Sequence, residues 1–135
     1  MNIALWIVQV LLAFAFFMAG AFKTFTPNEE LIAGGMTWVA AVPSFLPKVA
    51  GVAEILGAIG LIVPALTRIK PSLTALAAAG LVLVMVPAAL LHVSLGEWAM
   101  LPSNLVLGGL AAFVAWGRYK ARPIAERSAA TAATA

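Results

Sequence analysis

The chain opens with a run of about 20 residues, from Ile3 to Phe22, that contains no charge. An α-helix of that length rises about 30 Å, which matches the hydrocarbon core of a bilayer. Three further stretches, at about residues 47–66, 71–93 and 102–117, have the same apolar character. Only 10% of the residues are charged and 64% are hydrophobic, whereas soluble domains carry about 25% charged residues. The sequence therefore predicts an all-α integral membrane protein.

The apolar stretches predict one domain, residues 1–117, folded as a four-helix bundle with antiparallel spans. The spans are expected at about residues 3–23, 47–66, 71–93 and 102–117. Residues 24–46 should form an extracytoplasmic loop that contains a short helix. Residues 118–135 should form a tail that is first basic and then disordered, because Ser, Ala and Thr dominate its last part.

Basic residues are distributed unevenly over the loops. Arg68 and Lys70 lie between the second and third spans, and further arginines and lysines lie in the tail. The first loop balances its lysines with glutamates, and the third loop holds only Glu97. Because Lys and Arg are enriched on the cytoplasmic side of membrane proteins, this distribution predicts that both termini are cytoplasmic.

The loop between the first two spans carries helix signals of its own. Thr26 is expected to cap a short helix, with Pro27 at the first helical position and Glu29 at the third, as in a capping box. This helix should end at Gly34-Gly35. The apolar segment 36–42 is too short to cross a membrane, so we expect it to lie in the interface or to fold over the bundle as a lid.

Glu54 is the single carboxylate in the apolar segment 51–64. An ionisable side chain within a span costs at least ~2.5 kcal/mol, so it usually faces protein and has a partner. Gly51, Gly57 and Ala58 share its helical face, and small residues allow helices to approach closely. We therefore expect Glu54 to point into the bundle.

The predicted topology brings four polar residues to the outer leaflet, one from each span: Lys23, Glu54, His92 and Asn104. We expect them to form a hydrogen-bonded cluster in which Glu54 accepts from Lys23, from His92 or from both. The inner half of the predicted bundle offers only Gln9. The four outer residues are the candidate binding site.

The composition excludes several kinds of chemistry. The chain has no cysteine, which removes thiolate catalysis, iron–sulfur clusters and thiolate metal sites. A single histidine rules out a multi-histidine metal site within one chain, so no metal is expected. The basic residues flank membrane spans, where topology and anionic lipid explain them better than nucleic acid does.

Short motifs mark three of the predicted spans: Gly20-Ala21-Phe22-Lys23, Gly51-x-x-Glu54-x-x-Gly57 and the terminal His92. With the four-span layout they resemble the DoxX-like membrane proteins over about residues 3–116. That family often has a leucine after the lysine, where this chain has Thr24. The resemblance implies a compact four-helix bundle in the bacterial plasma membrane. It implies no single activity, since relatives include a subunit of a thiosulfate:quinone oxidoreductase, subunits of oxidative-stress complexes and an assembly chaperone for nicotinic receptors.

Two alternatives stay open for Glu54: it forms a buried pair with Lys23 that only fixes helix register, or it faces a ligand. For His92 a hydrogen-bonding role is favoured over haem ligation, because a single axial ligand in an apolar chain is weak evidence for a haem site.

Three hypotheses for the function follow. The favoured one is a non-catalytic accessory or assembly protein that binds a lipid, a quinone-like ligand or a partner's helix. The alternative is a subunit of a quinone-linked oxidoreductase, and a solute or proton carrier ranks last. Membrane lipid, a second copy or another membrane protein are the expected partners, and quinone is the one cofactor considered.

Overall fold

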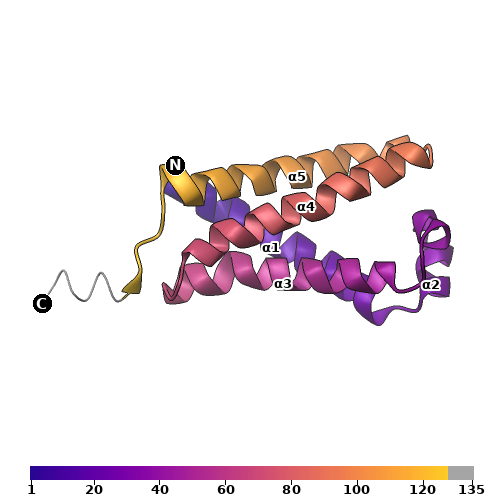
Figure 1. Cartoon of the computed structure of the whole chain (residues 1–135), viewed down its shortest axis with the longest axis horizontal. Helices are drawn as coiled ribbons and strands as arrows, with labels where there is room; N and C mark the ends of the chain where they lie inside the picture. The colour runs from indigo at the N-terminus through magenta and orange to yellow at the C-terminus, as the bar shows by residue number, and fades with distance from the viewer. Residues whose placement is uncertain (128–135) are drawn as a thin grey trace, which may run out of the picture.

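The computed structural model describes residues 1–127 and contains four long helices (Figure 1). They are α1 (Asn2–Phe25), α3 (Leu46–Thr67), α4 (Ser72–Ser94) and α5 (Leu101–Trp116). Each is long and apolar enough to cross a membrane, the last together with the short elements that flank it. No strand occurs within residues 1–127. The prediction of an all-α chain with four spans is confirmed.

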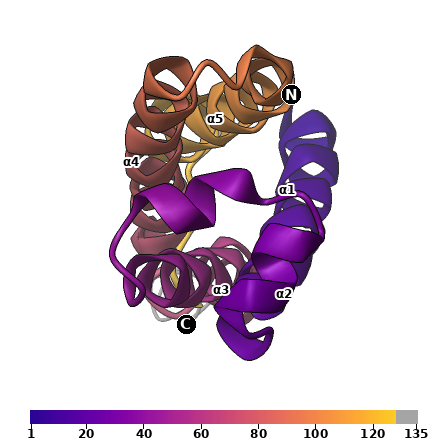
Figure 2. The ribbon, with the colours of Figure 1, turned by 90° about the vertical axis from the view of Figure 1, so that its right-hand side faces the viewer.

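Shorter elements occupy the connections. Between α1 and α3 lie α2 (Asn28–Ala33) and the 3-10 helix η1 (Thr37–Ala41). A 3-10 turn, η2 (Trp98–Met100), leads into α5, and a π-helical segment, η3 (Gly117–Ala121), prolongs α5. Figure 2 shows η1 lying across one end of the bundle, where a lid was one of the predicted arrangements.

Helices that follow one another in the chain run antiparallel and pack side by side (Figures 1 and 2). The most extensive contacts join α1 to α3 and α4 to α5, and α3 packs on α4. The contact between α1 and α5 is smaller and closes the ring. Residue 1 and residues 118–127 lie at one end of the bundle, here called the termini end, and α2, η1 and η2 lie at the other, the loop end.

The predicted capping box is wrong. Pro27, not Thr26, precedes α2, and no side chain caps this helix. Thr26 instead ends α1, in an extended conformation with its backbone N–H bonded to Phe22. The backbone of Thr26 therefore ends α1 and does not begin α2. The predicted end of α2 is confirmed: Gly35 has φ +106°, and the Met36 N–H bonds to Leu31 O at 2.9 Å, as in a Schellman motif.

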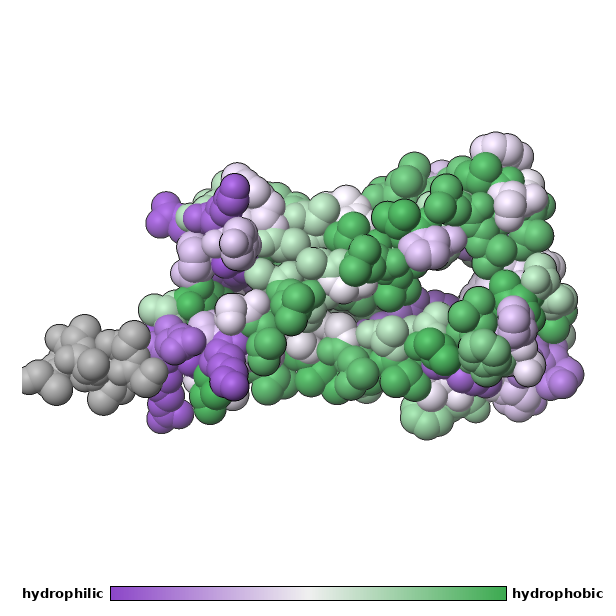
Figure 3. All heavy atoms as spheres, viewed as in Figure 1, coloured by the Kyte–Doolittle hydropathy of each residue, from purple (hydrophilic) through white to green (hydrophobic). Residues whose placement is uncertain are grey.

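The apolar core is confined to one half of the bundle. Its buried residues reach toward the loop end only as far as Phe16, Ala58, Met85 and Ala111; the others are Leu12, Ala13, Leu61, Ala78, Leu81 and Val114. We call the part between this level and the loop end the loop half, and the remainder the termini half. The outer surface of both halves is largely apolar (Figure 3), as a lipid-facing surface must be.

The chain does not leave the bundle where the basic tail was predicted to begin. The helical path continues through η3, and Arg118 within it is only 4% exposed. A single π-helical turn extends the last span beyond the apolar run that marked its predicted end. The predicted disorder of the final residues falls beyond residue 127, outside the described part.

Candidate functional site

The helices α1 and α3 approach so closely in the loop half that their backbones touch. A methyl group added to Gly20 would lie 2.5 Å from Gly51 O, and one added to Gly51 would lie 2.7 Å from Gly20 O. Nothing larger than hydrogen fits at either position. Thr24 donates to Gly20 O at 2.7 Å, so its hydroxyl stays on its own helix. This crossing fixes the rotation of both helices and brings Lys23 to Glu54.

The Lys23 Nζ donates to both carboxylate oxygens of Glu54, at 2.6 and 2.7 Å. Glu54 is 2% exposed and the lysine side chain 14% exposed. The predicted inward orientation of Glu54 and its pairing with Lys23 are therefore confirmed. Lys48 adds a second layer, since its Nζ donates to Lys23 O at 2.7 Å and also to Thr26 O. These bonds fix the end of α1 against the start of α3.

His92 has a different partner from the one expected. Its Nδ1 lies 3.3 Å from Glu97 Oε2, and the hydrogen bonds to Glu54 among residues 1–127 come from Lys23. The reason is local: Gly96 adopts φ +72°, and the Glu97 N–H bonds back to His92 O at 2.9 Å. This turn folds the glutamate over the end of α4. Glu97 also accepts from Thr37 of η1 at 3.2 Å.

Asn104 stands apart from both pairs. Its Nδ2 lies 3.6 Å from Met85 Sδ, a long contact to a weak acceptor, and its Oδ1 is buried without a hydrogen-bond partner. The residue is 8% exposed. The single polar cluster of the sequence prediction is thus divided into a pair on α1 and α3, a pair at the end of α4, and an isolated amide on α5.

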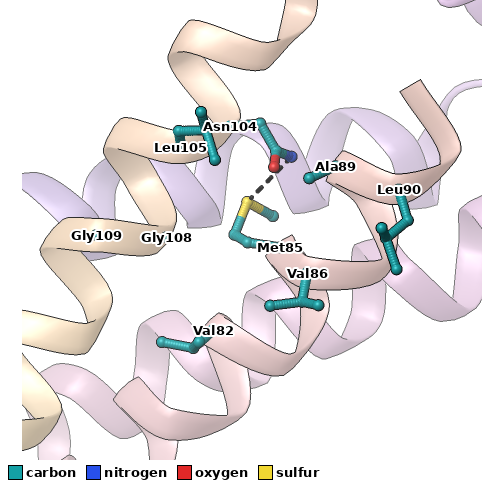
Figure 4. Close-up of a pocket in the computed structure, with 9 residues that line it drawn as sticks. All are labelled: Val82, Met85, Val86, Ala89, Leu90, Asn104, Leu105, Gly108 and Gly109. Carbon is teal, nitrogen blue, oxygen red and sulfur yellow. Dashed lines mark hydrogen bonds between the residues drawn. The ribbon is translucent and has the colours of Figure 1, made fainter. Parts of the chain in front are cut away.

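The amide of Asn104 borders an apolar groove of about 310 Å³ between α4 and α5 (Figure 4). The other residues that line it are Val82, Met85, Val86, Ala89, Leu90, Leu105, Gly108 and Gly109. A methyl group at Gly109 would meet no atom within 4 Å. The groove opens toward the membrane, because Leu90 and Leu105 beside it are well exposed.

The interior of the loop half is small or polar. On the four spanning helices between the core and the loop end, the buried residues are Gly20, Pro47, Gly51, Glu54, His92 and Asn104. This stretch is about 14–18 Å long at 1.5 Å per residue. Figure 3 shows an opening at this level between the α4–α5 pair and the α1–α3 pair. The two helix pairs therefore separate at the level where no large apolar side chain of the spanning helices lies between them.

The termini half holds a polar network that the sequence did not predict. Gln9 donates to Leu61 O at 2.7 Å and accepts from Arg118 Nε at 2.5 Å. Arg118 also donates to Asn2 Oδ1 at 2.6 Å and lies over the ring of Trp6 at 5.2 Å. The inner half thus offers more than Gln9. The signal available in the sequence was Gln9 itself, a buried amide that needs a partner.

Residues 1–127 bring together no group of three or more acidic or histidine side chains that could hold a metal ion. What the loop half provides is hydrogen-bonding groups beside apolar walls. Such an arrangement can bind and orient an amphiphilic molecule.

Comparison with known proteins gives the family to which the chain belongs. Neither a curated protein nor a solved structure matches it. The sequence profile of the DoxX-like family matches residues 7–114. The match spans all four long helices, including the Gly20–Gly51 crossing, the Lys23–Glu54 pair and the groove, and it ends just before Arg118. The chain therefore belongs to the DoxX-like family of membrane proteins.

Proposed function

We propose that this protein is a non-catalytic membrane accessory or assembly protein that binds one amphiphilic molecule in the groove between α4 and α5. The observation that carries the proposal is the Asn104 Oδ1, a buried acceptor without a donor at the edge of an apolar groove. Leaving such a group unpaired costs about 1–3 kcal/mol, and a ligand hydroxyl or N–H would recover it. If the amide is rotated, its N–H would donate to a ligand carbonyl.

The dimensions of the groove support a small ligand. A volume of about 310 Å³ lies at the low end for small-molecule sites, ~300–1,000 Å³. It accommodates one ring or a segment of an acyl chain and is too small for a whole helix. Because the groove opens between the exposed Leu90 and Leu105, the ligand would enter sideways from the bilayer. A lipid or a quinone-like molecule has the required chemistry.

The alternative is a subunit of a quinone-linked oxidoreductase. It draws support from two protonatable pairs in the loop half, Lys23–Glu54 and His92–Glu97. These pairs could exchange protons with a quinone head group. The alternative requires a quinone among the bound molecules, which makes the two proposals separable.

Gly109→Leu tests the groove directly. A Cβ at Gly109 would meet no atom within 4 Å, so a leucine there can extend into the groove and occupy the space of a ligand. Gly80→Leu is the matched control, since a Cβ at Gly80 also meets no atom and Gly80 lies outside the groove. Both variants and the wild type are purified in mild detergent, and their lipid extracts are analysed by mass spectrometry. We expect one lipid or quinone species to be lost in Gly109→Leu and retained in Gly80→Leu.

The outcomes divide the hypotheses. A bound lipid supports the accessory role, and a bound quinone supports the oxidoreductase subunit. Identical extracts from all three proteins, with no thermal shift on adding quinone or lipid, would refute ligand binding in the groove. If a membrane protein co-purifies and no small molecule does, the bound partner is a protein and the ligand hypothesis is wrong.

We propose a location in the bacterial plasma membrane, which membership of the DoxX-like family supports, with both termini in the cytoplasm, which the charge distribution supports. All lysines and arginines except Lys23 and Lys48 lie at the termini end. Fusing a reporter that is active only in the cytoplasm to the C-terminus would test this orientation. An active reporter is expected, and an inactive fusion that is correctly inserted would reverse the topology.

A further inference from the structure

Arg118 is a buried cation for which residues 1–127 provide no ion-pair partner. Its hydrogen bonds go to the neutral groups Gln9 Oε1, Asn2 Oδ1 and Arg122 O, the last at 3.3 Å. Within residues 1–127 the ion pairs are Lys23–Glu54 and His92–Glu97. A guanidinium in a low-dielectric site is stable only when its charge is compensated. The neutral acceptors satisfy some of its N–H groups but leave its charge unpaired.

One part of this guanidinium has no acceptor at all. The Arg118 Nη2 is buried and makes no hydrogen bond, although the residue as a whole is 4% exposed. Arginine presents its donors in a planar fork that matches carboxylate and phosphate oxygens. An unfilled donor on a nine-tenths buried arginine is therefore a position where an anion is expected.

A pocket of about 250 Å³ lies beside Arg118. It is bordered by the first turn of α4, at Pro71, Ser72 and Ala75, and by the chain that follows α5. The positive end of a long helix dipole favours an anion at such a place. Arg118 is also among the residues that line this pocket, so the start of α4 and the arginine with an unfilled donor border the same space.

The tail is held over this pocket. Arg68 Nε donates to Ala125 O at 3.0 Å, and the Arg127 N–H bonds to Arg68 O at 2.8 Å. The surroundings are cationic, because this end also carries Lys70, Lys120 and Arg122. Among the described residues, Glu126 is the one acid that lines the pocket, and it forms no ion pair with Arg118. Its carboxylate would repel a bound anion and so lower the affinity of the pocket for it.

We propose that this pocket binds the phosphate of an anionic membrane lipid, with Arg118 as its central ligand. The site lies at the end of the spanning helices, where the exposed side chains Leu73, Trp116 and Tyr119 mark the membrane surface. A phosphodiester there has its acyl chains along the apolar outer face and its charge against the guanidinium. The site is separate from the groove at the loop end and does not depend on it.

The test compares Arg118→Gln with Lys120→Gln. Both remove one positive charge from the same turn, but Lys120 is exposed and Arg118 is buried. The full-length variants are titrated by native mass spectrometry with phosphatidylglycerol, phosphatidylcholine and inorganic phosphate. We expect the wild type to prefer phosphatidylglycerol, and Arg118→Gln to lose about tenfold in affinity for it, as removal of a charged hydrogen-bond partner does. Lys120→Gln should change the affinity less than about twofold.

Equal losses in the two variants would show that only the general charge attracts the lipid, and would overturn the site. If inorganic phosphate binds but phosphatidylglycerol binds no better than phosphatidylcholine, the ligand is free phosphate and not the lipid. Glu126→Gln keeps the proposal testable if Arg118→Gln fails to fold. Removing this competing acid should raise the affinity for phosphatidylglycerol severalfold, and no change there would also count against the proposal.

Discussion

In the termini half of the bundle, Leu12, Phe16, Leu61 and Leu81 fill the space between the helices. In the loop half the same helices meet through glycines, one ion pair and one isolated amide. The first arrangement stabilises the fold by close packing of large apolar side chains. The second leaves apolar walls and an unused acceptor. The difference indicates that apolar packing is concentrated in the termini half, whereas glycine contacts and polar pairs join the helices in the loop half. Each prediction below removes a contact from one of the two halves.

The largest effect is expected from Lys23→Met. The substitution leaves the Glu54 carboxylate buried without a partner, which costs about 3–5 kcal/mol of folding free energy when one member of a buried pair is removed. The double variant Lys23→Met/Glu54→Leu should recover most of that loss, because it removes both charges. Unfolding by SDS titration from mixed micelles measures both values. A Lys23→Met protein as stable as the wild type would show that the pair does not hold α1 on α3.

Leu61→Ala disturbs the termini half in the same assay. Leu61 is fully buried in the core, and a cavity left by a Leu-to-Ala change costs about 2–5 kcal/mol. Leu90→Ala is the control in the loop half, since Leu90 is 66% exposed beside the groove, and it should cost less than about 1 kcal/mol. Similar losses for the two would remove the contrast between the halves.

Gly51→Ala should destabilise the protein by about 1–3 kcal/mol, the usual cost of overpacking. The added methyl group would meet the Gly20 carbonyl and the Thr24 hydroxyl, and the backbone atom cannot move aside. Gly80→Ala makes the same chemical change where no atom is near, so it should cause no loss. If Gly51→Ala is also tolerated, α1 and α3 do not cross in backbone contact.

Glu97→Gln should have the smallest effect, below about 1 kcal/mol, because the pair with His92 is partly exposed. This variant tests whether the His92–Glu97 and Lys23–Glu54 pairs are independent of each other. The change should leave the Lys23–Glu54 pair intact, so the double variant Glu97→Gln/Lys23→Met should show additive losses. A strong coupling between the two changes would mean that the pairs form one network after all.

Much of the fold could be predicted because a bilayer permits few structures. Apolar length predicted the four spans, and the cost of an unpaired carboxylate predicted that Glu54 would face the bundle and pair with Lys23, His92 or both. The sequence also predicted that His92 ends the third span, but it did not identify Glu97 as the partner of His92. Glu97 looked like a loop charge, and only the turn at Gly96 brings it back to the helix end.

Arg118 was missed for a different reason. Arginines after a span usually signal topology, and nothing in the local sequence separates a buried one from its exposed neighbours. Its burial follows from the π-helical turn and from Gln9, which lies far away in the chain. The groove likewise depends on how α4 and α5 pack on each other, which spacing within either helix does not determine. The need of a buried charge for a partner could be derived from the sequence, whereas the contacts of Arg118 depend on how distant helices pack.

The ring of helices also bears on how the protein is made. Each span packs on the next one in the chain, so the bundle can assemble one hairpin at a time as synthesis proceeds. The contact of α1 with α5 and η3 is the exception, since Arg118 reaches back to Gln9 and Asn2. Assembly should therefore finish at this seam. In pulsed hydrogen exchange during refolding, the amides of η3 are expected to gain protection last.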